Sequence, residues 1–66
     1  MRSFESVSVA LRVLIVDDHA AWRQQISSLV RKSGGWDVVG EAADGRDAVA
    51  MAASLKPDLI LLDVEL

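Results

Sequence analysis

Val13-Leu14-Ile15-Val16-Asp17-Asp18 is the stretch that decides the fold of this 66-residue chain. Four consecutive apolar residues, most of them β-branched, are typical of a strand covered on both faces, as in parallel sheets flanked by helices. Two adjacent carboxylates follow, and we expect both charges to lie outside the core, at the strand end where open α/β sheets build ligand sites. Leu59-Ile60-Leu61-Leu62-Asp63 repeats this pattern. The sequence therefore predicts two buried strands that deliver three acids to one edge of a sheet.

The segments between and beside these strands complete a β-α-β-α-β order. We expect strands at 12–16, 36–42 and 59–63, one helix ending before Gly34-Gly35, and a second ending before Pro57. Glycines after a helix permit the left-handed backbone of its terminus, and proline cannot continue a helix. Because crossovers between such strands are right-handed and short, the three strands should be parallel. The predicted class is α/β, with helices on both faces of the sheet.

Each helix has an apolar face in the sequence. The first should begin at a cap formed by Asp18 or His19 and bury one stripe, with Trp22 in the core: Trp22, Ile26, Leu29 and Val30. The second should be capped by Asp44 and bury Ala48, Ala52 and Leu55. The strand at 36–42 contains Gly40, which weakens a strand interior, and so is expected at the outside of the sheet.

Length and composition restrict the class of protein. The chain is 52% hydrophobic and 26% charged, which is typical of one small globular domain rather than a disordered chain. It has no cysteine, so disulfides and thiolate metal sites are excluded. Its basic residues form no cluster, which argues against direct nucleic-acid binding, and its longest apolar run, 48–53, falls far short of the roughly 20 residues that span a bilayer. We expect a cytoplasmic protein with a disordered leader at 1–10.

Three motifs resemble the receiver domain of bacterial two-component response regulators. They are the stretch Val13 to His19, the stretch Gly40-Glu41-Ala42-Ala43-Asp44-Gly45, and the stretch Lys56-Pro57-Asp58 followed by 59–63. The first two are similar to the subclass with a C-terminal helix-turn-helix for DNA. The resemblance covers 11–66, and it implies the flavodoxin-like strand order 2-1-3-4-5, with the strand at 12–16 between the other two.

The resemblance also implies a function and a site. Asp63 would be the phosphoacceptor, receiving a phosphoryl group from a sensor histidine kinase, so the domain would be a signalling module rather than an enzyme. Asp18 and Asp63 would ligate Mg²⁺ directly, Asp17 would do so through water, and the backbone carbonyl of Glu65 would add an oxygen. Oxygen ligands and open positions suit this cation.

The likeness extends over about half of a receiver domain. The Ser/Thr and the Lys that complete the family's site do not follow Asp63 in this sequence. Several alternatives therefore stay open: a docking or decoy module that accepts no phosphate, a truncated gene product without function, or, more remotely, a metal-dependent phosphatase. The alternative without a functional site is that Asp17 and Asp18 only cap a helix and that Asp63 lies in solvent. We also expect the strand at 59–63 to be an apolar edge, which would leave the isolated chain molten, self-associating or unfolded.

Overall fold

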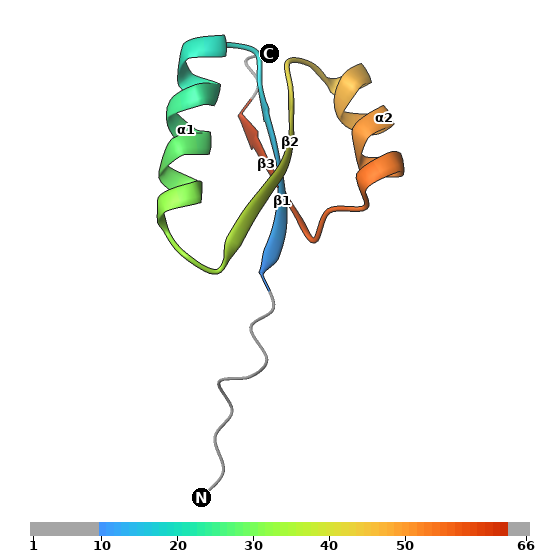
Figure 1. The fold of residues 1–66 in the computed structure, drawn as a ribbon. Coiled ribbons are helices and arrows are strands. Elements are labelled where there is room, and N and C mark those ends of the chain that lie inside the picture. Colours follow the sequence, from blue (N-terminus) through green and yellow to red (C-terminus); the bar gives the residue numbers. More distant parts are fainter. Residues whose placement is uncertain (1–9, 64–66) are drawn as a thin grey trace, which may run out of the picture.

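A central strand, β1, holds the domain together in the computed structural model, which describes residues 10–63. The elements alternate along the chain: β1 (Leu11–Asp17), α1 (Ala20–Lys32), β2 (Trp36–Ala42), α2 (Gly45–Leu55) and β3 (Leu59–Asp63). The strands form one parallel sheet in the order β2-β1-β3. Figure 1 shows α1 and α2 on opposite sides of this sheet. The predicted α/β class, the element order and the central place of the first strand are confirmed.

β1 supplies both halves of the core. Val13 and Ile15 pack with Val30 of α1, and Leu14 and Val16 pack with Ala42 and with the helix on the other face. All four β1 residues are buried. Because successive side chains of a strand point to opposite faces, a strand with a helix on each side must be apolar at every position.

α1 begins at a predicted cap and ends at the predicted glycines. His19 is its N-cap, and Ser33 its C-cap. Gly34 and Gly35 follow with φ of +73° and +77°, a left-handed conformation that glycine adopts without steric cost.

The buried face of α1 differs from the predicted one. Trp22 is 60% exposed and Leu29 66% exposed, so placing Trp22 in the core was wrong. Val30 and Ser27 are buried instead, and Ile26 lies between these extremes. Relative to the predicted orientation, α1 is rotated about its axis. Polar residues beside the apolar stripe, such as Ser27, therefore face the sheet.

β2 and α2 begin and end where the sequence predicts. β2 is an outer strand, and Val39 is an additional residue in its pairing with β1, between Val38 and Gly40. The Asp44 side chain accepts a hydrogen bond from the Asp47 amide at 2.8 Å and caps α2 as predicted. Ala48 and Ala52 contact the core, together with Met51, which the sequence analysis did not single out.

β3 is the least covered strand. α1 and α2 both lie over β1 and β2, and within residues 10–63 the backbone of neither helix comes close to that of β3. Leu59 and Leu61 contact the Val13–Ile15–Val30 side of the core, whereas Ile60 and Leu62 are exposed. In the described part of the chain, the outer edge of β3 has no neighbouring strand. The prediction of an exposed apolar edge is confirmed for these residues.

Two expectations lie outside the described residues. They concern the leader at 1–10, of which only Ala10 is described, and the backbone carbonyl of Glu65. Within residues 10–63, neither helix has the length and apolar character needed to cross a membrane.

Candidate functional site

The three acids singled out in the sequence lie together at the carboxyl ends of β1 and β3. Asp17 and Asp63 are partners in the parallel register of the two strands. One pocket is lined by Asp17, Asp18 and Asp63, together with His19 and Trp22. The three acids therefore share one pocket, of which the exposed indole of Trp22 forms part. Among the described residues, however, the group whose possible ligand atoms lie within 4.8 Å of one another consists of Asp17, Asp18 and His19, and Asp63 is not part of it.

Asp17 is buried, contrary to the expectation that both adjacent charges lie outside the core. It is 1% exposed, and its Oδ1 atom accepts a hydrogen bond from the backbone amide of His19 at 2.8 Å. Its Oδ2 atom has no hydrogen-bond partner among the residues that the structure describes. A buried carboxylate oxygen without a partner is costly, so a cation or a proton is the natural complement of this atom.

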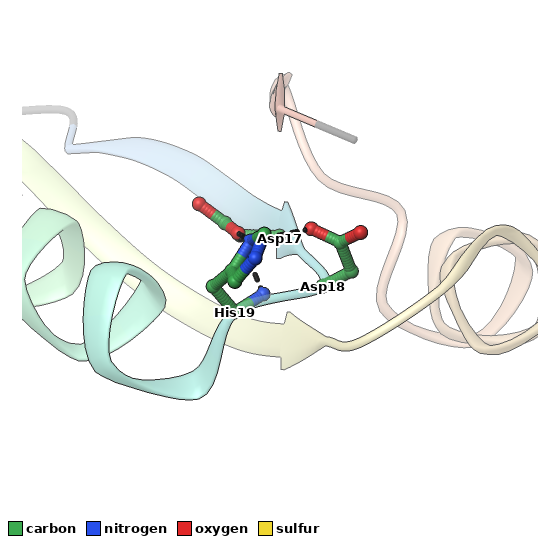
Figure 2. Close-up of side chains that lie close together, drawn as sticks. All are labelled: Asp17, Asp18 and His19. Atoms are coloured by element: carbon green, nitrogen blue, oxygen red, sulfur yellow. Dashed lines mark hydrogen bonds and ion pairs between the residues drawn. The ribbon is translucent and has the colours of Figure 1, made fainter. Parts of the chain in front are cut away.

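Asp18 and His19 are more accessible and face each other. His19 Nδ1 lies 2.9 Å from Asp18 Oδ1 and 3.8 Å from Asp17 Oδ1. Figure 2 shows the His19 ring beside the two aspartates. One possible ligand atom from each of the three residues lies within 4.8 Å of the others. His19 is therefore the N-cap of α1 and also places its ring beside Asp17 and Asp18 in the pocket.

Asp63 occupies the open side of the pocket. It is the last residue of β3 and is exposed, unlike its register partner Asp17. An exposed carboxylate can be reached by a large donor molecule, whereas a buried one cannot.

The donor set fits a hard divalent cation. Carboxylate oxygens of Asp17, Asp18 and Asp63 are the ligand type that Mg²⁺ prefers, and the unpartnered Oδ2 of Asp17 supplies a specific reason for a cation to enter. Three like charges in one pocket also repel one another unless a cation or a proton intervenes.

Sequence reasoning missed Arg23. Its NH1 group donates a hydrogen bond to the backbone carbonyl of Asp17 at 2.8 Å, and its Nε atom lies 3.4 Å from Oε1 of Glu41 on β2. The signal available in the sequence was an arginine in the second turn of a helix that starts at the acids, with an acid on the neighbouring strand.

Comparison with known proteins agrees with this geometry. The family model described as the response regulator receiver domain matches residues 13–66. The response regulator protein VraR of Staphylococcus epidermidis is 50% identical over 56 residues, which cover 85% of this chain and 27% of that protein. The protein-glutamate methylesterase/protein-glutamine glutaminase of Pseudoalteromonas translucida is 45% identical over 58 residues, covering 88% of this chain and 15% of the relative. The transcriptional regulatory protein PdtaR of Mycobacterium tuberculosis is 42% identical over 59 residues, covering 89% and 28%.

Solved structures give the same result. The response regulator domain of Thermotoga maritima CheB superimposes with a TM-score of 0.82 at 42% identity, covering 86% of this chain and 42% of that one. The signal receiver domain of the putative response regulator NarL from Mycobacterium tuberculosis gives 0.80 at 38% identity, covering 83% and 44%. The chain thus spans less than a third of the length of these curated relatives and less than half of the two solved chains. By sequence and by fold, it belongs to the family of response regulator receiver domains.

Proposed function

We propose that Asp63 is the phosphoacceptor of this receiver domain and that Asp17 and Asp18 form the acid pair that serves it. The observation that carries the proposal is the register of the parallel sheet, which sets Asp63 beside Asp17 at the carboxyl ends of β3 and β1. The two acids differ in access, since Asp17 is buried and Asp63 is exposed. The accessible carboxylate is the one that can attack a donor.

The proposed reaction is a phosphoryl transfer between two side chains. A carboxylate oxygen of Asp63 attacks the phosphorus of a phosphohistidine on a sensor kinase. The new O–P bond forms an acyl phosphate, and the N–P bond of the donor breaks. The imidazole leaves with the electron pair of that bond and takes a proton from solvent. Such transfers require alignment and charge stabilisation more than covalent assistance from other side chains.

We propose that Mg²⁺ is held by Asp18 and Asp63 directly and by Asp17 through water, with the backbone carbonyl of Glu65 as a further ligand. When bound, Mg²⁺ neutralises charge on the transferred phosphoryl oxygens. The chain's own contribution is to keep the acids in place. The His19 amide fixes one oxygen of Asp17, and this leaves the other oxygen free for a ligand.

Family membership supports the proposed partner of this reaction, and the cysteine-free sequence is compatible with the proposed setting. Receiver domains of response regulators receive phosphate from histidine kinases, and we propose that this chain does so in the cytoplasm, where a cysteine-free sequence needs no oxidising environment. The domain serves as a signalling module in this proposal, with the kinase supplying the phosphoryl group.

Membership of the DNA-binding subclass stays a prediction. The relatives include a transcriptional regulatory protein, and they also include a methylesterase whose shared region is a small part of its length. The stretches Asp17-Asp18-His19 and 40–45 favour the DNA-binding subclass.

Transfer of radioactive phosphate from a phosphorylated sensor kinase tests the proposed acceptor. We expect the chain to gain label and Asp63→Asn to lose it, and the label should be released by hydroxylamine, as an acyl phosphate is. Asp58→Asn is a matched control, because Asp58 lies just before β3 at the opposite end, where its carboxylate accepts a hydrogen bond from the Arg12 amide. Equal labelling of Asp63→Asn and the original chain would show that another residue is the acceptor.

Titration with Mg²⁺ tests the metal site separately. The fluorescence of Trp22 should report binding, since this indole lines the acid pocket. We expect Asp18→Ala and Asp63→Ala each to weaken binding tenfold or more, because even groups that only hold a ligand in place contribute about 10- to 100-fold. Asp37→Ala removes an exposed acid at the start of β2 and should leave the affinity unchanged. A titration in which all variants agree would exclude the proposed ligands.

A further inference from the structure

Arg23 connects the acid pocket to the outer strand of the sheet. Its side chain is only 18% exposed, although arginine side chains on a helix surface usually extend into water. The NH1 group donates to the backbone carbonyl of Asp17 at 2.8 Å. The Nε atom faces Oε1 of Glu41 at 3.4 Å. One side chain of α1 therefore touches the last residue of β1 and a residue of β2.

The contact with Asp17 acts on the buried acid of the pocket, whose Oδ2 atom has no hydrogen-bond partner among the described residues. Asp17 is fixed on one side by the His19 amide, which donates to Oδ1. Arg23 fixes the backbone of the same residue from the other side. The free Oδ2 atom is thus attached to a residue held at two points.

Glu41 lies beside the guanidinium. Nε makes no hydrogen bond within residues 10–63, so Glu41 attracts the group by charge and accepts no hydrogen bond from Nε. Arg31, two turns further along α1, also lies near Glu41, with NH2 3.8 Å from Oε2. Arg31 is 59% exposed and does not reach the acid pocket. Glu41 thus faces two arginines, of which only Arg23 continues to Asp17.

We propose that Arg23, oriented by Glu41, is a positioning residue for the phosphoacceptor pocket, holding Asp17 where it completes the cation site. This inference rests on the proposed function. Arg23 touches neither the cation nor the reacting atoms, and it acts only through the Asp17 carbonyl. The planar guanidinium suits this task because it presents donors in a fixed geometry, whereas a lysine ammonium is a single flexible point.

The direction in which Arg23→Gln changes the Mg²⁺ affinity distinguishes a positioning role from a simple electrostatic effect. Arg23 is positive and lies near a site for a positive ion, so removing its charge alone should tighten Mg²⁺ binding. Removing an anchor of Asp17 should weaken it. The two explanations predict opposite shifts for Arg23→Gln.

The affinity for Mg²⁺, measured with the full chain, provides the first test. We expect Arg23→Gln to bind about tenfold more weakly, the lower end of the range for groups that hold a metal ligand in place. Arg31→Gln is the matched control: it removes the same charge, from the same helix and from beside the same Glu41, and should leave the affinity within twofold. Glu41→Gln should weaken binding less than Arg23→Gln. Arg23→Lys keeps the charge and should recover part of the loss.

Amide hydrogen exchange without metal provides the second test. The His19 amide donates to Asp17, so its exchange should accelerate severalfold in Arg23→Gln and stay unchanged in Arg31→Gln. The Asp47 amide, which donates to Asp44 at the start of α2, serves as the reference for general loosening.

The outcomes are distinct. Weaker Mg²⁺ binding and faster His19 exchange in Arg23→Gln alone support the proposal. Unchanged or tighter binding in Arg23→Gln, or equal weakening in Arg31→Gln, overturns it. If the original chain binds no Mg²⁺, the proposed metal site is wrong, and exchange at His19 alone decides whether Arg23 positions Asp17.

Discussion

β1 and β3 have almost the same sequence pattern and very different surroundings. Each contains four aliphatic residues followed by an aspartate, at 13–17 and 59–63, and the two segments are register partners in the sheet. Leu14 of β1 has no exposed surface, whereas Leu62 of β3 is 67% exposed. An apolar run predicts a strand, but the position of the strand in the sheet order determines how much of it is buried.

The same contrast separates the two aspartates. Asp17 ends a strand between two neighbours and beneath α1, and is buried, whereas Asp63 ends the edge strand and is exposed. Burial restrains the first, and exposure gives a partner access to the second. The proposed roles, a fixed support and a reactive acceptor, follow from this difference in burial.

Truncation of one leucine in each strand should show the largest difference. Leu14→Ala removes a fully buried side chain and should cost about 2–5 kcal/mol of unfolding free energy. That is comparable to the whole stability expected of a domain this small. Leu62→Ala should cost less than about 1 kcal/mol, because most of its surface is already in water. Urea unfolding followed by circular dichroism measures both, and equal costs would contradict the comparison.

The fold was predictable because its signals are local and agree with one another. The strands at 36–42 and 59–63 have their predicted bounds, and glycines or a proline follow the helices where the sequence placed them. Lys56, before Pro57, leaves the right-handed helical region as predicted. It adopts the left-handed conformation of a helix C-cap, with φ of 50°, rather than the extended conformation usual before proline.

The buried face of α1 was not predictable from apolar spacing alone. Trp22 and Leu29 lie at one side of the apolar arc, and Arg23 and Ser27 lie just beyond its other side. Any small rotation of the helix exchanges one pair for the other. The observed rotation buries Ser27 and brings Arg23 to the Asp17 carbonyl and to Glu41, contacts across elements that a helical pattern does not contain.

The acids of the site were identified from the sequence, but their environments were not. Adjacent aspartates after a strand indicate a pocket, yet nothing in the pair says which member is buried. The residue at which β1 ends decides which aspartate is buried, because Asp17 is still within β1 and Asp18 is not. The contact between His19 and Asp18 likewise depends on the turn that connects β1 to α1.

Gly40 of β2 pairs with Leu14 of β1 and lies in close packing. A substitution there should change the unfolding free energy less than Leu14→Ala does. A Cβ atom added there would lie 2.8 Å from Cδ1 of Leu55 and 3.2 Å from Cδ1 of Leu14. We expect Gly40→Ala to cost stability near the lower end of the roughly 1–3 kcal/mol typical of overpacking, because both atoms it meets are the ends of leucine side chains that can shift. Gly45→Ala is the control, because no atom lies within 4 Å of a Cβ at that position, and it should stabilise by about 0.4–1 kcal/mol. Thermal unfolding of both variants checks the sign of each change.

The cap of α2 should contribute less to the unfolding free energy than the core does. Asp44→Ala removes the acceptor for the Asp47 amide and should cost about 1 kcal/mol. Asp44→Asn keeps a side-chain oxygen at that place and should cost only a few tenths of that, which separates capping from charge. Chemical denaturation midpoints of the two variants give the comparison, and equal losses would assign the effect to charge.

The smallest effect on stability, and a clear effect on association, is expected at the edge of β3. Leu62→Lys replaces an exposed leucine and should change the unfolding free energy by no more than about 0.5 kcal/mol. An apolar edge with free backbone groups is nevertheless a template for pairing with another chain, and natural edges are protected by charged residues, lysine above all. We therefore expect the 66-residue chain to self-associate as its concentration rises, and Leu62→Lys to reduce this in sedimentation velocity. Leu29→Lys supplies the matched control, since Leu29 is 66% exposed but lies on α1. If Leu29→Lys reduces association as much as Leu62→Lys, general charge repulsion is the cause, and the contrast between β1 and β3 does not extend to association.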